Sequence, residues 1–361
     1  MLKRLLTALF ISALACATVI AQELSPTHLH QPTLTPQNSG TTSGLIAVWP
    51  VNPQVVWASG RAGTFTVTTD GGQTWRAGVV PGAEALQFRD VQAFSASVAY
   101  LMSIGANPTD FRVYKTLDSG ATWTIQFENQ NPLAFYDAFA FWTPHRGILH
   151  SDSVNGVFPD FRTTDGMSWQ DISNNMPPAL PGEFSFASSG TCVTTQGGRN
   201  AWICTGGSDI ARVLATRDGG DTWNAYNTAL VSSPSAGAFT VDFRDPHNGI
   251  VGGGDLDPGD PNNARTAISN DGGQTWTLTN PPPVTGAIFG LSYVGHSGGG
   301  VGDSGRAVVI TANDGGAAWT PDEGNTWFAL PDVSGFWAVA FATPKAGWLV
   351  GTDGRILKIS F

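Results

Sequence analysis

Ionisable and aromatic side chains share one position in a series of similar apolar segments. The segments align on four phenylalanines, Phe94, Phe141, Phe243 and Phe341. The residues four places earlier are Asp90, Asp137, Phe239 and Trp337. Two segments therefore carry a carboxylate where the other two carry an aromatic ring, which singles out the acidic pair for closer attention.

Further polar residues accompany the two aspartates. Arg89 and Tyr136 directly precede them, and Glu183 begins the corresponding segment that follows. Paired carboxylates beside an arginine and a tyrosine suit general acid–base catalysis, including cleavage of glycosidic bonds. The candidate catalytic residues are Asp90, Asp137 and Glu183, and the candidate ligand-binding residues are Arg89, Tyr136 and Arg212. His150 and Asp152 are weaker additions to this set.

The same residue types have a second interpretation. Aspartate and arginine side chains can also link neighbouring sheets by bonding to backbone amides, without binding any ligand. The sequence leaves both interpretations of the polar cluster open.

Two other motifs suggest cofactor or metal chemistry. Residues 300–305 satisfy G-x-G-x-x-G, but the dinucleotide fingerprint needs a helix after the glycines, and residues 306–310 have the composition of a strand. The acidic loop around Asp255, Asp257 and Asp260 offers oxygen ligands for calcium but lacks the glycine and glutamate of an EF-hand. A solvated acidic loop is the alternative. We expect no cofactor and no metal.

Composition and charge exclude several classes of function. The chain has 361 residues, of which only 13% are charged, and its net charge is −10. An acidic chain without a basic patch is a poor ligand for nucleic acid. The high glycine and tryptophan content argues against a helical enzyme or a coiled coil.

The first residues resemble an export signal. Lys3 and Arg4 precede an apolar run over residues 5–16, and Ala21 fits the position before a signal peptidase site. We expect residues 1–21 to be a signal peptide and the mature chain to start at Gln22, in the periplasm or outside the cell. A retained anchor and lipidation at Cys16 are the alternatives. No later segment is long and apolar enough to span a membrane.

Two cysteines remain after the predicted signal. Cys192 and Cys204 flank a turn-like stretch centred on Gly198, so a hairpin there would place them opposite each other. Opposed cysteines in an exported protein predict a disulfide, and two buried free thiols are the alternative.

An internal repeat accounts for most of the chain. The pattern S/T-x-D-x-G-x-x-W occurs five times, first at residues 68–75, and a shortened copy spans residues 163–169. The aspartates are Asp70, Asp118, Asp165, Asp218, Asp271 and Asp322. Because they recur in six successive units, we expect them to stabilise turns and not to take part in catalysis.

The repeat period predicts the architecture. Units of about 50 residues, each with several short strands, are typical of propeller blades. A seventh unit begins near Val333 and stops before any such turn, and we expect the N-terminal stretch at residues 27–35 to supply its missing outer strand. We therefore predict an all-β, seven-bladed propeller over residues 22–361, closed by that N-terminal strand.

The repeated turn and the segments around Phe336–Phe341 and Gly347–Gly351 carry a family resemblance. They resemble the photosystem II stability/assembly factor family, within the wider Asp-box (BNR-repeat) propellers that include sialidases and xyloglucan-cleaving glycosidases. They are also similar to exported bacterial propellers labelled oxidoreductase or glycosyl hydrolase. The resemblance implies a propeller, and its assembly-factor members bind proteins and are not enzymes. The Arg-Ile-Pro segment of sialidases is missing here.

Two functions follow from these observations. The first is a non-catalytic binding or assembly module for a protein or glycan partner at the propeller face, acting as a monomer. The second is a glycan hydrolase or lyase that uses the carboxylate, arginine and tyrosine cluster. A nicotinamide-dependent oxidoreductase is disfavoured because the strand after the glycines leaves no helix to hold a pyrophosphate.

Sequencing of the mature N-terminus tests the export signal. When the full chain is expressed in a bacterium, the exported protein should begin at Gln22 because small residues precede it. A lipid-modified chain beginning at Cys16 would support the lipoprotein alternative, and an uncleaved chain would contradict both.

Overall fold

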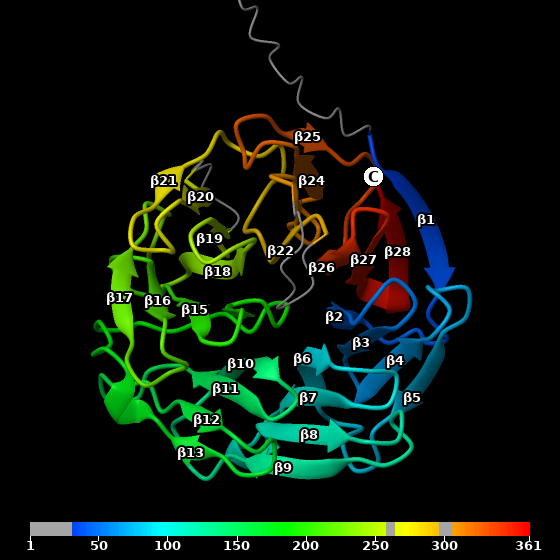
Figure 1. Cartoon of the computed structure of the whole chain (residues 1–361), viewed down its shortest axis with the longest axis horizontal. Coiled ribbons are helices and arrows are strands. Elements are labelled where there is room, and N and C mark those ends of the chain that lie inside the picture. The colour runs from blue at the N-terminus through cyan, green and yellow to red at the C-terminus, as the bar shows by residue number, and fades with distance from the viewer. Residues whose placement is uncertain (1–30, 258–263, 296–304) are drawn as a thin grey trace, which may run out of the picture.

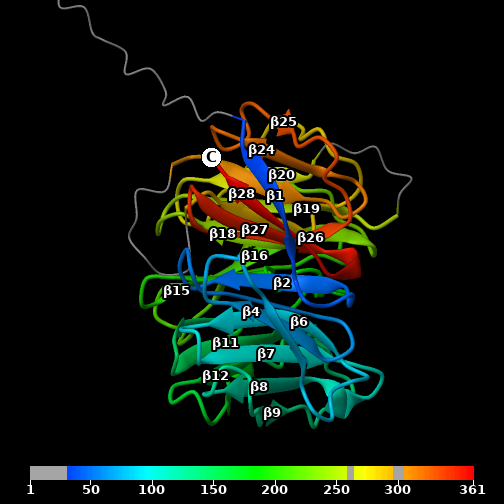
Figure 2. The same cartoon turned by 90° about the vertical axis from the view of Figure 1, so that its right-hand side faces the viewer.

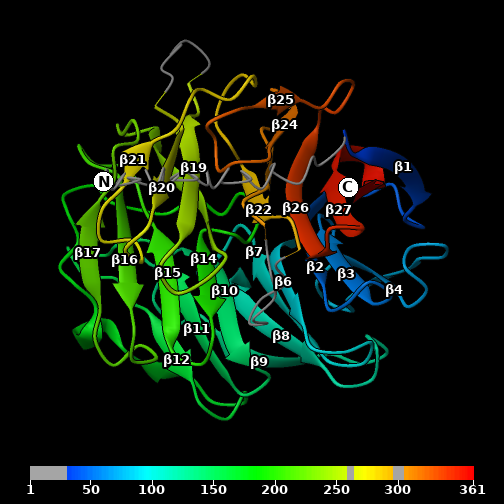
Figure 3. The ribbon, with the colours of Figure 1, turned by 45° about the horizontal axis from the view of Figure 1, so that its top comes forward.

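The computed structural model describes residues 31–257, 264–295 and 305–361, and these residues form seven four-stranded antiparallel sheets. The sheets surround a central axis, which Figure 1 shows face-on and Figure 2 from the side. In each sheet one edge strand faces the axis and the opposite edge strand lies at the rim (Figure 1 and Figure 3). The molecule is the predicted seven-bladed propeller.

The first four blades follow chain order. Blade 1 contains β2 (Leu45–Pro50), β3 (Val56–Gly60), β4 (Thr64–Thr68) and β5 (Arg76–Val79). Blade 2 contains β6 (Gln87–Ala93), β7 (Ala99–Ile104), β8 (Arg112–Thr116) and β9 (Thr124–Glu128). Blade 3 contains β10 (Tyr136–Thr143), β11 (Arg146–Ser151), β12 (Phe161–Thr163) and β13 (Gln170–Asp171). Blade 4 contains β14 (Val193–Gln196), β15 (Asn200–Cys204), β16 (Arg212–Thr216) and β17 (Asn224–Asn227).

The last three blades include the closing one. Blade 5 contains β18 (Ala236–Phe243), β19 (Gly249–Asp255), β20 (Thr266–Ser269) and β21 (Thr277–Leu278). Blade 6 contains β22 (Gly290–Tyr293), β23 (Val308–Thr311), β24 (Ala317–Thr320) and β25 (Phe328–Ala329). Blade 7 contains β26 (Phe336–Thr343), β27 (Ala346–Gly351), β28 (Arg355–Ser360) and β1 (Thr33–Asn38). Three short 3-10 helices cover Pro108–Asp110, Ser173–Asn175 and Thr352–Gly354. Within the described ranges, no helix has the length and apolarity needed to cross a bilayer.

The N-terminal strand closes the ring. β1 pairs antiparallel with β28, from Thr33 opposite Ser360 to Asn38 opposite Arg355. Figure 1 shows the blue β1 beside the red β28. The predicted stretch, residues 27–35, is corrected to residues 33–38, and residues 27–30 lie outside the described part of the chain. The pairing covers a strand edge that would otherwise be open.

The core lies between neighbouring sheets. Trp57, Trp202 and Trp348 occupy second strands and are wholly buried. Trp202 stacks on Phe243 of the next blade with ring centroids 3.6 Å apart, and its indole N–H donates to the Gly272 carbonyl at 2.8 Å. Each blade therefore packs through apolar faces that the strand alternation supplies.

The repeated turns hold themselves together. Asp70 accepts bonds from the backbone N–H of Thr74 at 2.9 Å and from the hydroxyls of Thr74 and Thr68. These bonds, led by the Thr74 hydroxyl, lower the pKa of Asp70 to about 2. The same arrangement recurs at the other five aspartates, Asp118, Asp165, Asp218, Asp271 and Asp322. The predicted turn-stabilising role fits these contacts.

The two cysteines are correctly placed but not joined. The register of β14 with β15 sets Cys192 opposite Cys204, and the Cys204 N–H donates to the Cys192 carbonyl at 2.9 Å. Both are free thiols in the core, so the predicted disulfide is not formed in this structure. Burial raises the pKa of both thiols well above its usual range, which disfavours the thiolate needed for oxidation.

Removal of the closing strand tests its contribution to stability. A chain that begins at residue 41 should melt at least about 5 °C below the mature protein, because β28 loses its edge partner and the ring its closure. A chain that begins at residue 31 retains β1 and serves as the control. Equal melting temperatures for the two truncations would show that the β1 pairing contributes little.

Candidate functional site

A β-bulge recurs near the start of the inner strands. In β6 the register passes from Phe88 opposite Ser103 to Asp90 opposite Met102, so Arg89 is the extra residue. The extra residues of β2, β10, β18 and β26 are Ile46, Asp137, Phe239 and Trp337. Because a bulge re-aims one side chain out of the regular alternation, these residues form a set.

Four of the bulged residues line one hollow. Arg89, Asp137, Phe239 and Trp337 border a cavity of about 480 Å³ where the inner strands begin. Its wall also includes Phe135, Asp152, Phe184, Ser185, Phe186 and Phe289. We call this hollow the mouth. It combines a largely aromatic wall with one cation and two carboxyl groups.

Aromatic rings form a continuous series around the mouth. Phe184, Phe186, Phe239, Phe289 and Trp337 contact one another in that order, with centroid separations of 4.9, 3.7, 5.9 and 5.2 Å. We call these five residues the aromatic arc. The guanidinium of Arg89 continues the arc, because it lies over the Trp337 ring at 5.6 Å from the centroid.

Asp137 and Asp152 form a carboxyl pair. Asp137 is wholly buried, and neither of its oxygens accepts a bond from any donor in the described structure. Burial raises its pKa well above the usual range, and the charge of Asp152 and a hydrogen bond with it raise the pKa further. That bond between two carboxyls requires a proton between them.

The partner carboxyl is also perturbed. Burial raises the pKa of Asp152 to about 6, although the backbone N–H of Ser185 donates to its Oδ1 at 2.8 Å and opposes the shift. The two groups titrate together, because the charge of Asp152 raises the pKa of Asp137 whereas the hydrogen bond with Asp137 lowers the pKa of Asp152. The pair therefore keeps a proton at pH values where exposed aspartates are ionised.

Arg89 influences the pair through its charge. Its Nη1 donates to the Ala187 carbonyl at 3.0 Å and its Nη2 to Oε1 of Gln87 at 2.9 Å. Burial lowers the pKa of Arg89 to about 10, and the charge of Asp137 opposes that shift. The guanidinium is held in place by its own bonds and by Trp337, and no bond from it to Asp137 is formed.

Asp90 lies apart from Asp137 and Asp152, so its prediction as part of the same cluster is corrected. It follows the bulge, so it faces the channel and accepts the Phe139 N–H of blade 3 at 2.9 Å. Phe141 packs over Gly147, whereas the corresponding pair in blade 2 is Ala93 opposite Ala99. Phe94 is therefore not the counterpart of Phe141, and Arg89, not Asp90, is the counterpart of Asp137.

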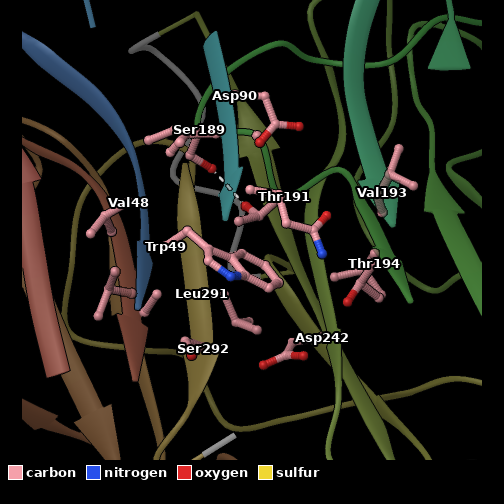
Figure 4. A pocket seen from close by; sticks show the side chains of 18 of the residues that line it. Val48, Trp49, Asp90, Ser189, Thr191, Val193, Thr194, Asp242, Leu291 and Ser292 are labelled. Carbon is pink, nitrogen blue, oxygen red and sulfur yellow. Dashed lines mark hydrogen bonds between the residues drawn. The ribbon is translucent and has the colours of Figure 1, made fainter. Parts of the chain in front are cut away.

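The channel below the mouth is small. A cavity of about 80 Å³ there is lined by Asp90, Asp242, Trp49 and Thr191, among others (Figure 4). Asp242 accepts the Tyr293 N–H at 2.9 Å, as Asp90 accepts that of Phe139. A space of that size accommodates a few water molecules and no sugar or peptide.

Tyr136 also lies away from the mouth. Its ring packs on Phe127 with centroids 5.1 Å apart, and its hydroxyl donates to the Pro159 carbonyl at 3.3 Å. It precedes the bulge of β10, so strand alternation turns it into the core between blades 2 and 3.

Glu183 is fully engaged by its neighbours. Arg212 donates to both of its oxygens at 2.8 and 2.5 Å, and Thr205 and the Leu180 N–H donate at 2.6 and 2.7 Å. The ion pair of Glu183 with Arg212 fixes the chain entering blade 4. Neither residue meets Asp137, so the expected cluster reduces to Arg89 and Asp137.

Asp152 and His150, the weaker candidates, lie next to each other and link blades 3 and 4. His150 Nδ1 meets Asp160 at 2.9 Å and Nε2 meets the Ser185 hydroxyl at 2.8 Å. The Ser185 hydroxyl donates to the Cys204 carbonyl at 2.9 Å. This network positions Ser185 to hold Asp152. No sequence spacing indicated Asp160 or Ser185.

The calcium and dinucleotide motifs fall partly outside the described residues. Asp255 accepts bonds from the Ser235 hydroxyl and the Asp257 N–H, at 2.7 and 2.9 Å. Asp260 and residues 300–304 lie outside the described residues. Among described residues, no three His, Cys, Asp or Glu side chains gather to hold a metal.

Comparison with known proteins shows the fold. Neither a protein-family model nor a curated protein matches the chain. A structure of YCF48 bound to D1 peptide is 16% identical and covers 92% of this chain and 97% of its own, with a TM-score of 0.63. YCF48 from Cyanidioschyzon merolae is 17% identical, with coverages of 91% and 98% and a TM-score of 0.60. The WD40 β-propeller domain of Doa1 is 10% identical, with coverages of 91% and 97% and a TM-score of 0.59. These likenesses show the propeller fold, and the two YCF48 structures are consistent with the fold that the family resemblance implies.

The pH dependence of stability tests the carboxyl pair. The folded-state pKa of Asp152, about 6, exceeds its ordinary value of 3.8, so the folded protein binds more protons and loses stability as pH rises between these values. Asp137 is raised further, by its burial and by the charge of Asp152, so Asp137→Asn should gain at least about 1.4 kcal/mol, the equivalent of one pKa unit, relative to wild type at pH 7.5, and nothing below pH 4. Denaturant unfolding at both pH values measures this difference.

Asp209→Asn, which changes an exposed carboxylate, is the control and should alter neither curve. If Asp137 served mainly to neutralise Arg89, the Asp137→Asn variant would instead lose about 3–5 kcal/mol. Such a loss would show that Asp137 has a structural role and is not kept for binding a ligand.

Proposed function

We propose that this chain is an exported, non-catalytic binding module that takes an apolar segment of a protein partner into the mouth. The observation that carries the proposal is the aromatic arc, five contacting rings in a hollow of about 480 Å³. Aromatic side chains around a concave site are the residues that dominate binding energy at protein interfaces.

The surroundings of the mouth suit an extended ligand. A second hollow of about 660 Å³ adjoins it and shares Phe135, Asp152 and Phe184 with it. Leu133 at this second hollow and Leu256 at the mouth are 67% and 51% exposed. Large apolar side chains exposed beside a hollow are typical of an interaction surface.

The similar fold of YCF48 supports a protein partner over a glycan. One of its structures holds a D1 peptide, which shows that a propeller of this shape takes a peptide ligand in that protein. Export of this chain remains a proposal from its first residues. The partner is then a protein of the periplasm, the membrane surface or the medium.

The geometry of the acids favours binding over glycoside hydrolysis. The two carboxyl groups of a glycosidase stand roughly 5 to 9.5 Å apart, with sugar or water between them. The carboxyl of Asp152 lies close enough to that of Asp137 to raise its pKa, and Arg212 occupies Glu183. The glycan enzyme therefore stays the second candidate, without a suitably separated pair to support it.

Peptide selection with mouth variants tests the proposed function. Random twelve-residue peptides displayed on phage and selected against the mature protein should yield sequences rich in aliphatic and aromatic residues. Trp337→Ser combined with Phe289→Ser should weaken their binding by about tenfold or more, because the arc loses two of its rings. Binding of the synthesised peptides is measured by calorimetry.

Phe328→Ser is the matched control, since Phe328 is an aromatic residue 42% exposed on the outer strand β25. It should leave the affinity unchanged. Equal affinity for the wild type and the Trp337, Phe289 double variant would refute the mouth as the binding site.

A further inference from the structure

We infer that the mouth takes a lysine side chain of the bound segment, with its ammonium group held between the carboxyls of Asp137 and Asp152. The inference deepens the proposed function and rests on it, because the partner segment that fills the mouth brings the lysine. It specifies the chemistry of recognition at the floor of the site.

The first observation is that the carboxyl oxygens of Asp137 lack a hydrogen-bond donor. Its two carboxyl oxygens are buried and meet no donor among the described residues. Buried polar atoms are nearly always hydrogen-bonded, so two unpaired oxygens on one side chain at the wall of a hollow indicate a missing donor. In the free protein, a proton shared with Asp152 is the substitute for that donor.

Glu183 differs from Asp137 in that its carboxylate oxygens are fully hydrogen-bonded. Glu183 is equally buried, yet four bonds from Arg212, Thr205 and Leu180 satisfy both of its oxygens. The chain thus completes one buried carboxylate in full and leaves the other, which lies at the mouth, incomplete.

The aromatic arc suits the rest of a lysine side chain. Its four methylene groups can pack on aromatic rings while the ammonium continues toward a polar floor. Ring faces also attract a cation within about 6 Å. Arg89 over Trp337, at 5.6 Å, shows that the arc already accepts one cation of this chain.

The shape of the pair favours an ammonium over other cations. An ammonium is compact and has three donors, so it can bridge two carboxyls that face each other. A guanidinium matches the edge of a single carboxylate, as Arg212 does with Glu183. A metal ion would need a third ligand, and no group of three suitable side chains occurs in the described ranges.

The charge of the site stays balanced when lysine binds. The pair with its shared proton carries one negative charge, and the pair with an ammonium and no proton carries the same. The proton passes to the solvent. The other groups facing the pair are Arg89, Asp160, His150 and the thiols of Cys192 and Cys204.

Two blocked peptides test the inference. Both have seven residues built from leucine, phenylalanine and alanine, and they differ only at the centre, which is lysine in one and norleucine in the other. At pH 7.5 the lysine peptide should bind about tenfold more tightly, as measured by calorimetry. Between pH 5.5 and 7.5 its affinity should rise several-fold, because binding releases a proton, whereas the norleucine peptide should bind equally at both.

Variants of the pair identify the contact. Asp137→Asn and Asp152→Asn should each abolish the preference for lysine and its pH dependence, while the norleucine peptide still binds. Asp209→Asn, an exposed carboxylate, should retain both. A third peptide with arginine at the centre, and a fourth with a free amino terminus and no lysine, should not exceed the norleucine peptide.

The outcomes separate the two proposals. The proposed function would be overturned if neither the lysine nor the norleucine peptide bound and the phage selection also yielded no binding peptide. Equal binding of the lysine and norleucine peptides, with loss on Trp337→Ser, would keep the binding module and overturn the lysine contact. Preference for arginine or for a free amino terminus would overturn it as well.

Discussion

The ring of inner strands imposes the constraint on which the other features depend, because seven strands must meet around one narrow channel. Several inner strands bond to the next blade through polar side chains. Gln92 exchanges two bonds with the backbone of Phe141, and Thr191 meets Thr240 at 2.7 Å. Unpaired backbone groups in a channel of about 80 Å³ would lower the stability of the fold, so the side chains at these positions serve to hydrogen-bond them.

In five inner strands the bulge frees one side chain from this structural role. In four of them the bulged side chain leaves the alternation and borders the mouth. Ile46, Arg89, Asp137, Phe239 and Trp337 differ in chemistry although they are equivalent in position. The ring therefore has the same backbone in these blades and an individual side chain at each, which is how a repeated fold acquires one specific site.

The fold could be predicted from the sequence because the repeated turn marks every sheet but the last. The site could be predicted only in part. Asp137 and Arg89 reach the mouth, but alignment on Phe94 was one residue out, and a slip of one residue moves a side chain to the other face. Asp90 was misplaced for this reason. Phe184, Phe186 and Phe289 were missed because they precede the regular strands of blades 4 and 6 and fall outside the alternation.

The pair of Asp137 and Asp152 destabilises the fold, which favours a role in ligand binding over a structural one. Two carboxyls held together in a buried place oppose folding increasingly as the pH rises above about 3.8, and for Asp152 the cost is complete above its pKa of about 6. Replacing either aspartate by asparagine would remove this cost without changing the packing. The same chain pairs Glu183 with Arg212 and Glu323 with both Arg244 and Arg306, so it has the means to neutralise buried acids. Because Asp137 is left without such a partner at the wall of the mouth, its lasting cost to the fold is best accounted for by a cation that arrives with the ligand.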